Sequence, residues 1–453
     1  MTIMWLVALP LAMAIVVLIL RQIRVLAAPL TAATLVAMAI LAISWGGGRP
    51  LVLMGRSIGL APGEAAGLAL CCVLLAVLVL YGYRMPQGAA AYPLTLAAMG
   101  LLAAATLVRN TTIAGALLEI GIIIAVLLVP SQRPGAAMTG MRVLTLMALS
   151  APMLLLASWA GEHLTGNPGD MLVARIGGLA VALGFGLSLG VVPFHIWLPP
   201  VFRHASPLAI AMLSVVANLA MLLYLGSMLQ VTMWPGQQAF YAAILLAGGV
   251  VTAVTGGIMA FPQRSVHGAL AYAALADMGI VLVGLGIGTA VSVRAATLHV
   301  ALRAVGIVAV AMAAGILQHS LDGDDLEHLR GGLRRAPRSL VAMAIGGASL
   351  AGLPLTAGFA TRFVLYRALA LQNVPWAALT VVASVGPAWA FVRCLLAAIV
   401  SAPTSGERRE PIMPALLSLA LSLSLLFLGI FPHLLNVLPG EWLALLWPTL
   451  DGF

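Results

Sequence analysis

Long apolar runs separated by short polar connections follow one another along almost the whole chain. The runs are roughly 18–24 residues long and do not alternate between apolar and polar positions, so they favour membrane-spanning helices over strands. About 14 spans are expected, the one at 338–371 being broken: 3–20, 26–45, 65–83, 91–108, 112–129, 138–158, 173–192, 206–229, 238–260, 268–286, 295–318, 338–371, 374–400 and 411–430. The sequence therefore predicts an all-α, polytopic membrane protein, with residues 1–453 forming a single transmembrane domain.

Composition supports the same class. Hydrophobic residues make up 62% of the chain and charged residues 8%, whereas a soluble domain carries about 25% charged residues. A chain this apolar has little surface to offer to water, so we expect the lipid bilayer to surround it. Cys71, Cys72 and Cys394 lie inside apolar runs without metal-ligand spacing, which favours small core residues over a metal site.

The basic residues indicate an orientation. The net charge is +9, but the arginines stand mostly singly between apolar runs, which is typical of membrane loops and argues against nucleic-acid binding. All 22 basic residues are arginine. If the N-terminus faces outside, twelve arginines fall in cytoplasmic loops and five on the other side. We therefore expect a multi-pass protein of the bacterial inner membrane with both termini on the periplasmic side.

Glycine and proline interrupt two of the predicted helices. Within 184–218, proline ends one apolar run, closes a short segment and opens the next run. Within 340–367 the helix is interrupted at Gly352-Leu353-Pro354 and again near Gly358. Broken helices at corresponding places point to an inverted repeat and to a transport path, although Gly and Pro are also common in membrane helices.

The repeat predicts four units within the domain. They are N-terminal accessory helices, a first repeat, a second repeat, and a C-terminal helix with its tail, over 1–90, 91–229, 238–400 and 401–453.

Ionisable residues inside the apolar runs are the candidates for function, because a charge at mid-membrane costs about 3 kcal/mol on insertion scales. Glu119 lies near the middle of its span and is the only charge on it. Asp277 lies within another span, and His267 opens that same span. His299 and Arg303 are four residues apart and so share a helix face.

Some of these residues have a simpler explanation. Arg142 and Arg393 can lie near helix ends and extend to the interface. His267 can be an interfacial residue. Asp277 can be a protonated contact between two helices. Arg362 also lies beside an apolar run.

Several motifs carry a resemblance to a known family. Residues 193–199 read Pro-Phe-His-Ile-Trp-Leu-Pro, a more specific string than a loop between helices requires. Further motifs follow in order at 263–279, 325–337 and 351–363. Together they resemble the antiporter-like membrane subunits of respiratory complex I, of membrane-bound hydrogenases and of multisubunit sodium/proton antiporters. The spacing around 201–207 is most similar to the NADH dehydrogenase subunit 2 type.

The resemblance covers roughly residues 90–400 and implies roles for particular residues. Glu119 matches a glutamate on the fifth helix that the family needs for proton translocation. The chain departs from the family at positions that usually carry lysine or, in the last case, lysine or glutamate: Arg142, Ser188, Asn218, His267 and Arg362. The buried groups that pass protons are thus absent there, or replaced by arginine, which keeps its proton in proteins.

The family's mechanism, a row of buried titratable groups joined by water, leaves two interpretations. In the first, protons pass by a modified route that runs from Glu119 past Ser188 or Asn218 to His267, with Arg362 as a fixed positive gate. In the second, the chain is a structural subunit that does not pump. The other candidates for the route are the ionisable residues in or beside the apolar runs, Arg142, Asp277, His299 and Arg303.

The resemblance also implies partners. We expect other membrane subunits of an NADH/quinone oxidoreductase or hydrogenase-type complex, with protons as the transported ion and sodium as the open alternative. A third interpretation is a membrane partner that drives uptake of a small solute such as inorganic carbon. The sequence holds no CxxC pair, no GxxxxGK loop and no cluster of metal ligands, so we expect no intrinsic catalytic site, no cofactor and no metal.

Overall fold

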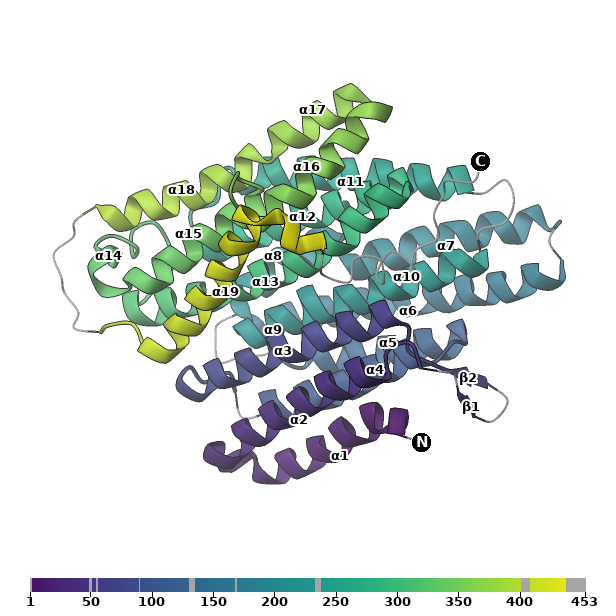
Figure 1. The fold of residues 1–453 in the computed structure, drawn as a ribbon, viewed down its shortest axis with the longest axis horizontal. Coiled ribbons are helices and arrows are strands. Elements are labelled where there is room, and N and C mark those ends of the chain that lie inside the picture. Colours follow the sequence, from purple (N-terminus) through teal and green to yellow (C-terminus); the bar gives the residue numbers. More distant parts are fainter. Residues whose placement is uncertain are drawn as a thin grey trace.

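The computed structural model describes residues 2–48, 51–53, 56–88, 90–129, 135–167, 169–232, 238–400 and 408–436. Its helices lie side by side with their axes in a roughly common direction (Figure 1). The α-helices are, in chain order, α1 (Trp5–Ile19), α2 (Arg24–Trp45), α3 (Pro62–Arg84), α4 (Ala91–Leu107), α5 (Thr111–Val126), α6 (Ala136–Gly166), α7 (Met171–Leu189), α8 (Leu198–His204), α9 (Pro207–Ala211), α10 (Asn218–Thr232), α11 (Gln238–Ala260), α12 (Val266–Ile287), α13 (Ala290–Leu321), α14 (Gly332–Arg335), α15 (Pro337–Ala351), α16 (Ala357–Gln372), α17 (Val374–Ala383), α18 (Val385–Ile399) and α19 (Ile412–Ile430).

Shorter elements connect or extend these helices. The 3-10 turns are η1 (Thr2–Met4), η2 (Leu20–Gln22), η3 (Phe194–Trp197) and η5 (Pro432–Asn436). A π-helical turn, η4 (Met212–Ala217), joins α9 to α10. Strands β1 (Leu51–Leu53) and β2 (Arg56–Ile58) form an antiparallel hairpin between α2 and α3.

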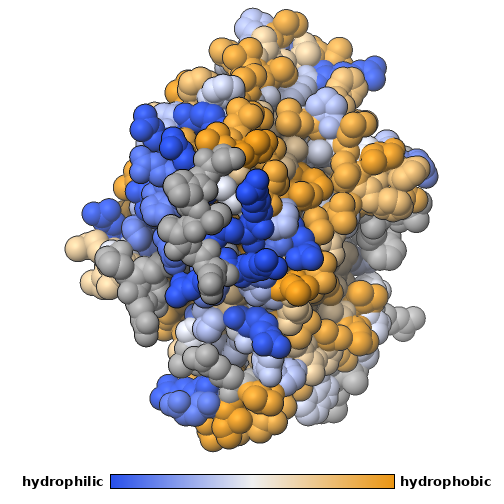
Figure 2. Space-filling view, turned by 90° about the vertical axis from the view of Figure 1, so that its left-hand side faces the viewer, coloured by the Kyte–Doolittle hydropathy of each residue, from blue (hydrophilic) through white to orange (hydrophobic). Residues whose placement is uncertain are grey.

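Eleven helical segments within the described ranges are long and apolar enough to cross a membrane. Helices α4 and α5 are shorter apolar helices, and the broken span expected at 338–371 is present as α15 and α16. The membrane-embedded, all-helical class is thus confirmed, while the count of fourteen spans stays a prediction. The surface agrees: exposed apolar side chains flank a hydrophilic area at one end of the bundle (Figure 2).

Helices α12 and α13 form the centre of the molecule. Of the residues of α12 only Tyr272 is not buried, and α13 is buried throughout its middle. A helix that is apolar on all sides is stable only inside a larger assembly of helices. Polar residues on these two helices therefore lie far from solvent.

The first helix break follows Leu189, the last residue of α7. Gly190 takes the left-handed conformation (φ 67°), and the N–H of Val191 donates to the carbonyl of Gly186 at 3.0 Å. This is the Schellman arrangement, in which a glycine without a Cβ ends a helix. The peptide bond between Val192 and Pro193 is cis.

The second helix break, after Ala351 of α15, has the same design. Gly352 is left-handed (φ 72°), and the N–H of Leu353 donates to the carbonyl of Ala348 at 2.9 Å. The chain resumes as a helix at Ala357. The two predicted breaks are therefore present, but the further interruption expected near Gly358 is not, because Gly358 lies in the first turn of α16.

The boundaries at 1–90, 91–229, 238–400 and 401–453 remain a prediction. Each expected repeat contains one break, after α7 and after α15. Residues 401–407 and 437–453, which include the expected C-terminal tail, lie outside the described residues.

Candidate functional site

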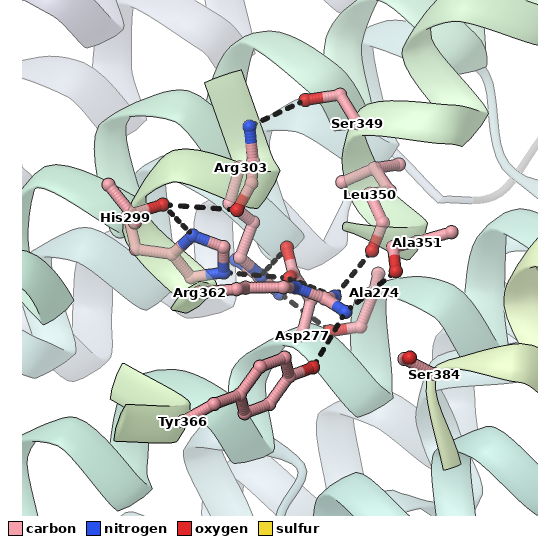
Figure 3. A network of polar contacts seen from close by, with 12 residues as sticks. Ala274, Asp277, His299, Arg303, Ser349, Leu350, Ala351, Arg362, Tyr366 and Ser384 are labelled. Carbon is pink, nitrogen blue, oxygen red and sulfur yellow. Dashed lines mark hydrogen bonds and ion pairs between the residues drawn. The ribbon is translucent and has the colours of Figure 1, made fainter. Parts of the chain in front are cut away.

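Four ionisable side chains from three helices meet around Asp277, in the middle of α12 (Figure 3). Its Oδ1 accepts hydrogen bonds from Arg362 Nη2 at 2.5 Å and Nε at 3.2 Å, and lies 2.8 Å from His299 Nε2. Arg303 Nε lies 3.8 Å from Oδ2. All four side chains are at least 97% buried. We call Asp277, His299, Arg303 and Arg362 the Asp277 cluster.

Helix geometry explains how α13 supplies two members of this cluster. His299 and Arg303 are one turn apart and therefore face the same side. Arg303 also donates to the carbonyls of Ser214 in η4, at 3.1 Å, and Ala274, at 3.2 Å. The Asp277 cluster is thus tied to the π-helical turn that precedes α10.

Arg362 has a second set of contacts, at the helix break. Its guanidinium donates to the carbonyl of Ala351 at 3.0 Å and to that of Leu350. The last carbonyls of a helix lack intrahelical partners, and Pro354 removes the N–H that Leu350 would otherwise meet. Gly352 leaves room for this side chain, since a Cβ there would lie 2.5 Å from the Cδ of Arg362.

His299 can hold one or two protons without losing its partners. Its Nδ1 lies 2.8 Å from Thr361 Oγ1, and that hydroxyl is also 3.3 Å from the carbonyl of Gly358. If Thr361 donates to Nδ1, Nε2–H donates to Asp277 and the ring is neutral. If Thr361 donates to Gly358 instead, both ring nitrogens donate and the ring is charged. The hydrogen-bond geometry around the ring therefore suits either form.

Glu119 lies in different surroundings, on α5. It is 4% exposed, and its Oε1 accepts a hydrogen bond from Ser150 Oγ on α6 at 3.0 Å. Its Oε2 is buried without a hydrogen-bond partner among the described residues, and no described arginine or histidine forms an ion pair with it. A buried carboxyl of this kind has one oxygen free for water or a proton.

His267 opens α12 beside a carboxylate that the sequence did not single out. Asp324 Oδ2 lies 2.7 Å from His267 Nδ1 and accepts the His267 backbone N–H at 2.9 Å. The side chain of His267 is buried, and its Nε2 has no partner among the described residues. Asp324 lies in a polar loop with other acids, so no local signal distinguishes it.

Three further predicted residues lie apart from the Asp277 cluster's ion pairs. Ser188 and Asn218 are buried and donate to carbonyls of their own helical segments, Ser188 to Gly184 at 3.0 Å and Asn218 to Ser214 at 3.2 Å. Arg142 is exposed on α6. The structure does not bring Arg142 to Glu119, and its place suits the interfacial explanation.

Two broken helices and buried ionisable groups inside a helical membrane bundle are typical of ion-transporting membrane proteins. The chain belongs to the NADH:quinone oxidoreductase/Mrp antiporter transmembrane family, whose model matches residues 118–386. The predicted resemblance is therefore confirmed.

Curated relatives agree with this membership. NADH-quinone oxidoreductase subunit N of Moorella thermoacetica is 28% identical over 265 residues, which are 57% of this chain and 54% of the relative. The subunit N of Chromohalobacter salexigens is 32% identical over 209 residues, 45% of this chain and 43% of the relative. The chain thus spans about half the length of the curated relatives it matches.

Solved structures share the fold over nearly the whole chain. A chain of the Mrp complex from Dietzia sp. has a TM-score of 0.85 at 19% identity, covering 98% of this chain and 97% of its own. A chain of the archaeal membrane-bound sulfane sulfur reductase has 0.84 at 21%, covering 99% of both. A chain of Thermus thermophilus complex I has 0.78 at 22%, covering 98% and 99%. At these identities the likeness establishes the fold alone.

Proposed function

We propose that the chain is a proton-translocating, antiporter-like subunit of a multisubunit membrane complex, and that Glu119 takes up and releases the proton. The observation that carries this proposal is the state of Glu119. It is buried, one oxygen accepts from Ser150, the other has no partner in the described part of the chain, and no described cation is paired with it. Its protonation can change without breaking an ion pair.

In this proposal the Asp277 cluster is the second place at which a proton is bound and released. Arg303 and Arg362 keep their protons, so they supply fixed positive charge, and Asp277 balances part of it. His299 is then the group that gains and loses a proton, with Thr361 rotating in step. His267, paired with Asp324, is a further titratable group at the end of α12.

The partners and the location are part of the proposal. The relatives are named as subunits of NADH-quinone oxidoreductase, and the structures are of complexes named Mrp, membrane-bound sulfane sulfur reductase and complex I. We infer other membrane subunits as partners and a bacterial inner-membrane location with both termini outside. Protons are the inferred ion, with sodium as the alternative.

The test is Glu119→Gln in the assembled complex, in sealed membrane vesicles. Glutamine keeps the shape and the bond to Ser150 but cannot release a proton, so proton translocation per turnover should fall while assembly persists. Glu162→Gln is the matched control, because Glu162 is exposed on α6 and bonds Thr112 at 3.0 Å. Unchanged translocation in Glu119→Gln would overturn the proposal.

A structural subunit that does not pump is the second candidate. Two features favour it. The two arginines of the Asp277 cluster keep their protons, and the side chains of Ser188 and Asn218 already bond to carbonyls of their own helical segments. This candidate expects normal assembly and unchanged translocation in Glu119→Gln, so the same measurement separates the two.

A further inference from the structure

A cavity of about 130 Å³ lies between the start of α3, the end of α4, the first turns of α5, and α10. It is separate from the Asp277 cluster. Its polar lining comes from Glu64, Thr106, Arg109, Thr111, Tyr224 and Ser227. Water takes about 30 Å³ in the liquid and needs two to four polar partners in a protein. The size and lining therefore suit a small group of waters.

An ion pair lines this cavity at its exposed side. Arg109 Nη1 lies 2.7 Å from Glu64 Oε1, and Nη2 donates to Oε2 at 2.8 Å. The side chain of Arg109 is 38% exposed while that of Glu64 is 5% exposed. A second hydrogen bond fixes Glu64, since its Oε2 accepts the backbone N–H of Ala61 at 2.7 Å. The pair thus has an inner, fixed carboxylate and an outer guanidinium.

The cavity extends along α5 as far as Leu118, the residue before Glu119. The hydroxyl of Tyr224 lies against Gly115, where a Cβ would be 2.5 Å away. Gly115 precedes Glu119 by four residues, so the hydroxyl lies at the same face of α5, one turn from the carboxyl. Tyr224 also donates to the carbonyl of Thr111 at 3.0 Å and lies 3.0 Å from Ser158 Oγ.

Helix α6 continues this line of polar groups. Ser158, next to Tyr224, and Ser150, next to Glu119, both project from α6 into its contact with α5 and α10. The Oε2 of Glu119, which has no hydrogen-bond partner among the described residues, lies at the inner end. Hydroxyls can both accept and donate, so such a line can orient water in either direction.

We propose that this cavity is a water-filled access route to Glu119 from the side where α4 ends and α5 begins, and that the Glu64–Arg109 ion pair closes it. Water fills the route, and a proton passes along the water to Glu119. In the predicted orientation this side faces the periplasm. The inference rests on the proposed function only for the use of the route. The route itself is open to a test that needs no transport.

The test places a cysteine in the cavity and measures its access to water. Ser227→Cys is made in the full chain within its complex, in right-side-out vesicles, and reacted with a membrane-impermeant methanethiosulfonate. Met221→Cys is the matched control, since Met221 lies on the same helix, is 1% exposed and does not line the cavity. Site-resolved mass spectrometry reads each cysteine. Cys71, Cys72 and Cys394 are buried internal references.

The labelling rate of Ser227→Cys also tests whether the Glu64–Arg109 ion pair closes the cavity. With Glu64→Gln and Arg109→Gln together, Ser227→Cys should react about tenfold faster, which corresponds to about 1.4 kcal/mol lost from the closed state. Arg109→Lys keeps the charge and should keep the reaction slow, which shows that loss of folding is not the cause. The amount of assembled complex is measured for every variant.

Each outcome decides part of the inference. Reaction at Ser227→Cys no faster than at Met221→Cys, in every background, overturns the route. Equal rates with and without the ion pair overturn its closing role. The labelling is repeated with Glu119→Gln: a reaction at Ser227→Cys that stays faster than at Met221→Cys, with unchanged proton translocation, would reject the proposed function while leaving the route in place.

Discussion

The helix break after Leu189 and the helix break after Ala351 share a backbone design but differ in the side chain that closes them. Each ends on a left-handed glycine with the same pair of capping bonds. At the first break, Trp197 Nε1 donates to the carbonyl of Leu187 at 3.1 Å. At the second, Arg362 donates to the carbonyls of Leu350 and Ala351.

The difference is one of charge. An indole closes the first break without adding a charge, so that break needs no counter-ion. A guanidinium at the second break is buried and therefore requires a carboxylate, which Asp277 provides at 2.5 Å. The backbone of the second half is thereby tied to an ion pair, whereas Glu119 in the first half forms none with a described residue. We infer that the first half holds the exchangeable acid and the second half a fixed charge.

The largest expected effect is the loss of Arg362. Arg362→Ala leaves Asp277 with fewer cations and leaves two buried carbonyls, those of Leu350 and Ala351, without a donor among the residues that the structure describes. Breaking one side of a buried pair costs about 3–5 kcal/mol. We expect a large fall in the thermal unfolding midpoint of the purified protein in detergent. Arg142→Ala, at an exposed site, should change stability by less than about 0.5 kcal/mol.

A double variant sharpens this prediction. Asp277→Asn with Arg362→Gln removes both charges of this pair but leaves Arg303 buried without its carboxylate, so it should be no more stable than Arg362→Ala, in which Asp277 still faces Arg303. If Arg362→Ala unfolds at the same temperature as the unaltered protein, the ion pair does not support the second break and the comparison fails.

The next largest effect on stability is expected from alanine at the two glycines that end α7 and α15. Alanine at Gly190 or Gly352 must adopt a left-handed conformation, which costs about 1–2 kcal/mol. A Cβ at Gly190 would lie 3.2 Å from the ring of Trp197, but one at Gly352 would lie 2.5 Å from the Cδ of Arg362. Gly352→Ala should therefore lower the unfolding midpoint more than Gly190→Ala. The reverse order would mean that Arg362 can move aside and that Trp197 is the more rigid cap.

A smaller effect is expected at Trp197. Trp197→Phe removes the bond to the carbonyl of Leu187, but that carbonyl keeps a second donor, the N–H of Gly190 at 3.3 Å. The loss should be about 1 kcal/mol, the ordinary net value of a hydrogen bond. Denaturant unfolding in detergent measures it. A loss as large as that of Arg362→Ala would show that charge is not what distinguishes the breaks.

The sequence predicted the elements better than their contacts. Apolar runs and prolines identify the spans and both breaks, because helix formation and its interruption are local. The pairing of Asp277 with Arg362 joins residues 85 positions apart, and neither residue's neighbours indicate it. Arg142 shows the converse, since its place beside an apolar run left open whether its helix turned it inward or outward.

The sequence also did not predict which polar side chains bond to Glu119, Tyr224 and His267. Ser150 and Ser158 stand among other small residues on α6, and only the packing of α6 against α5 and α10 gives them a role. Asp324 becomes distinct from its acidic neighbours only when the loop after α13 folds back onto His267.

The smallest stability effect is expected at Glu119. Glutamine has nearly the same volume, retains an acceptor for Ser150, and removes no ion pair with a described residue. Glu119→Gln should therefore shift stability by less than about 1 kcal/mol, measured by the unfolding midpoint. Asp277→Asn is the matched substitution in the second half, and it should cost several times more because it leaves Arg362 and Arg303 without their carboxylate, about 3–5 kcal/mol. If the two variants lose equal stability, Glu119 has a cationic partner when folded, and the division between an exchangeable acid and a fixed charge is wrong.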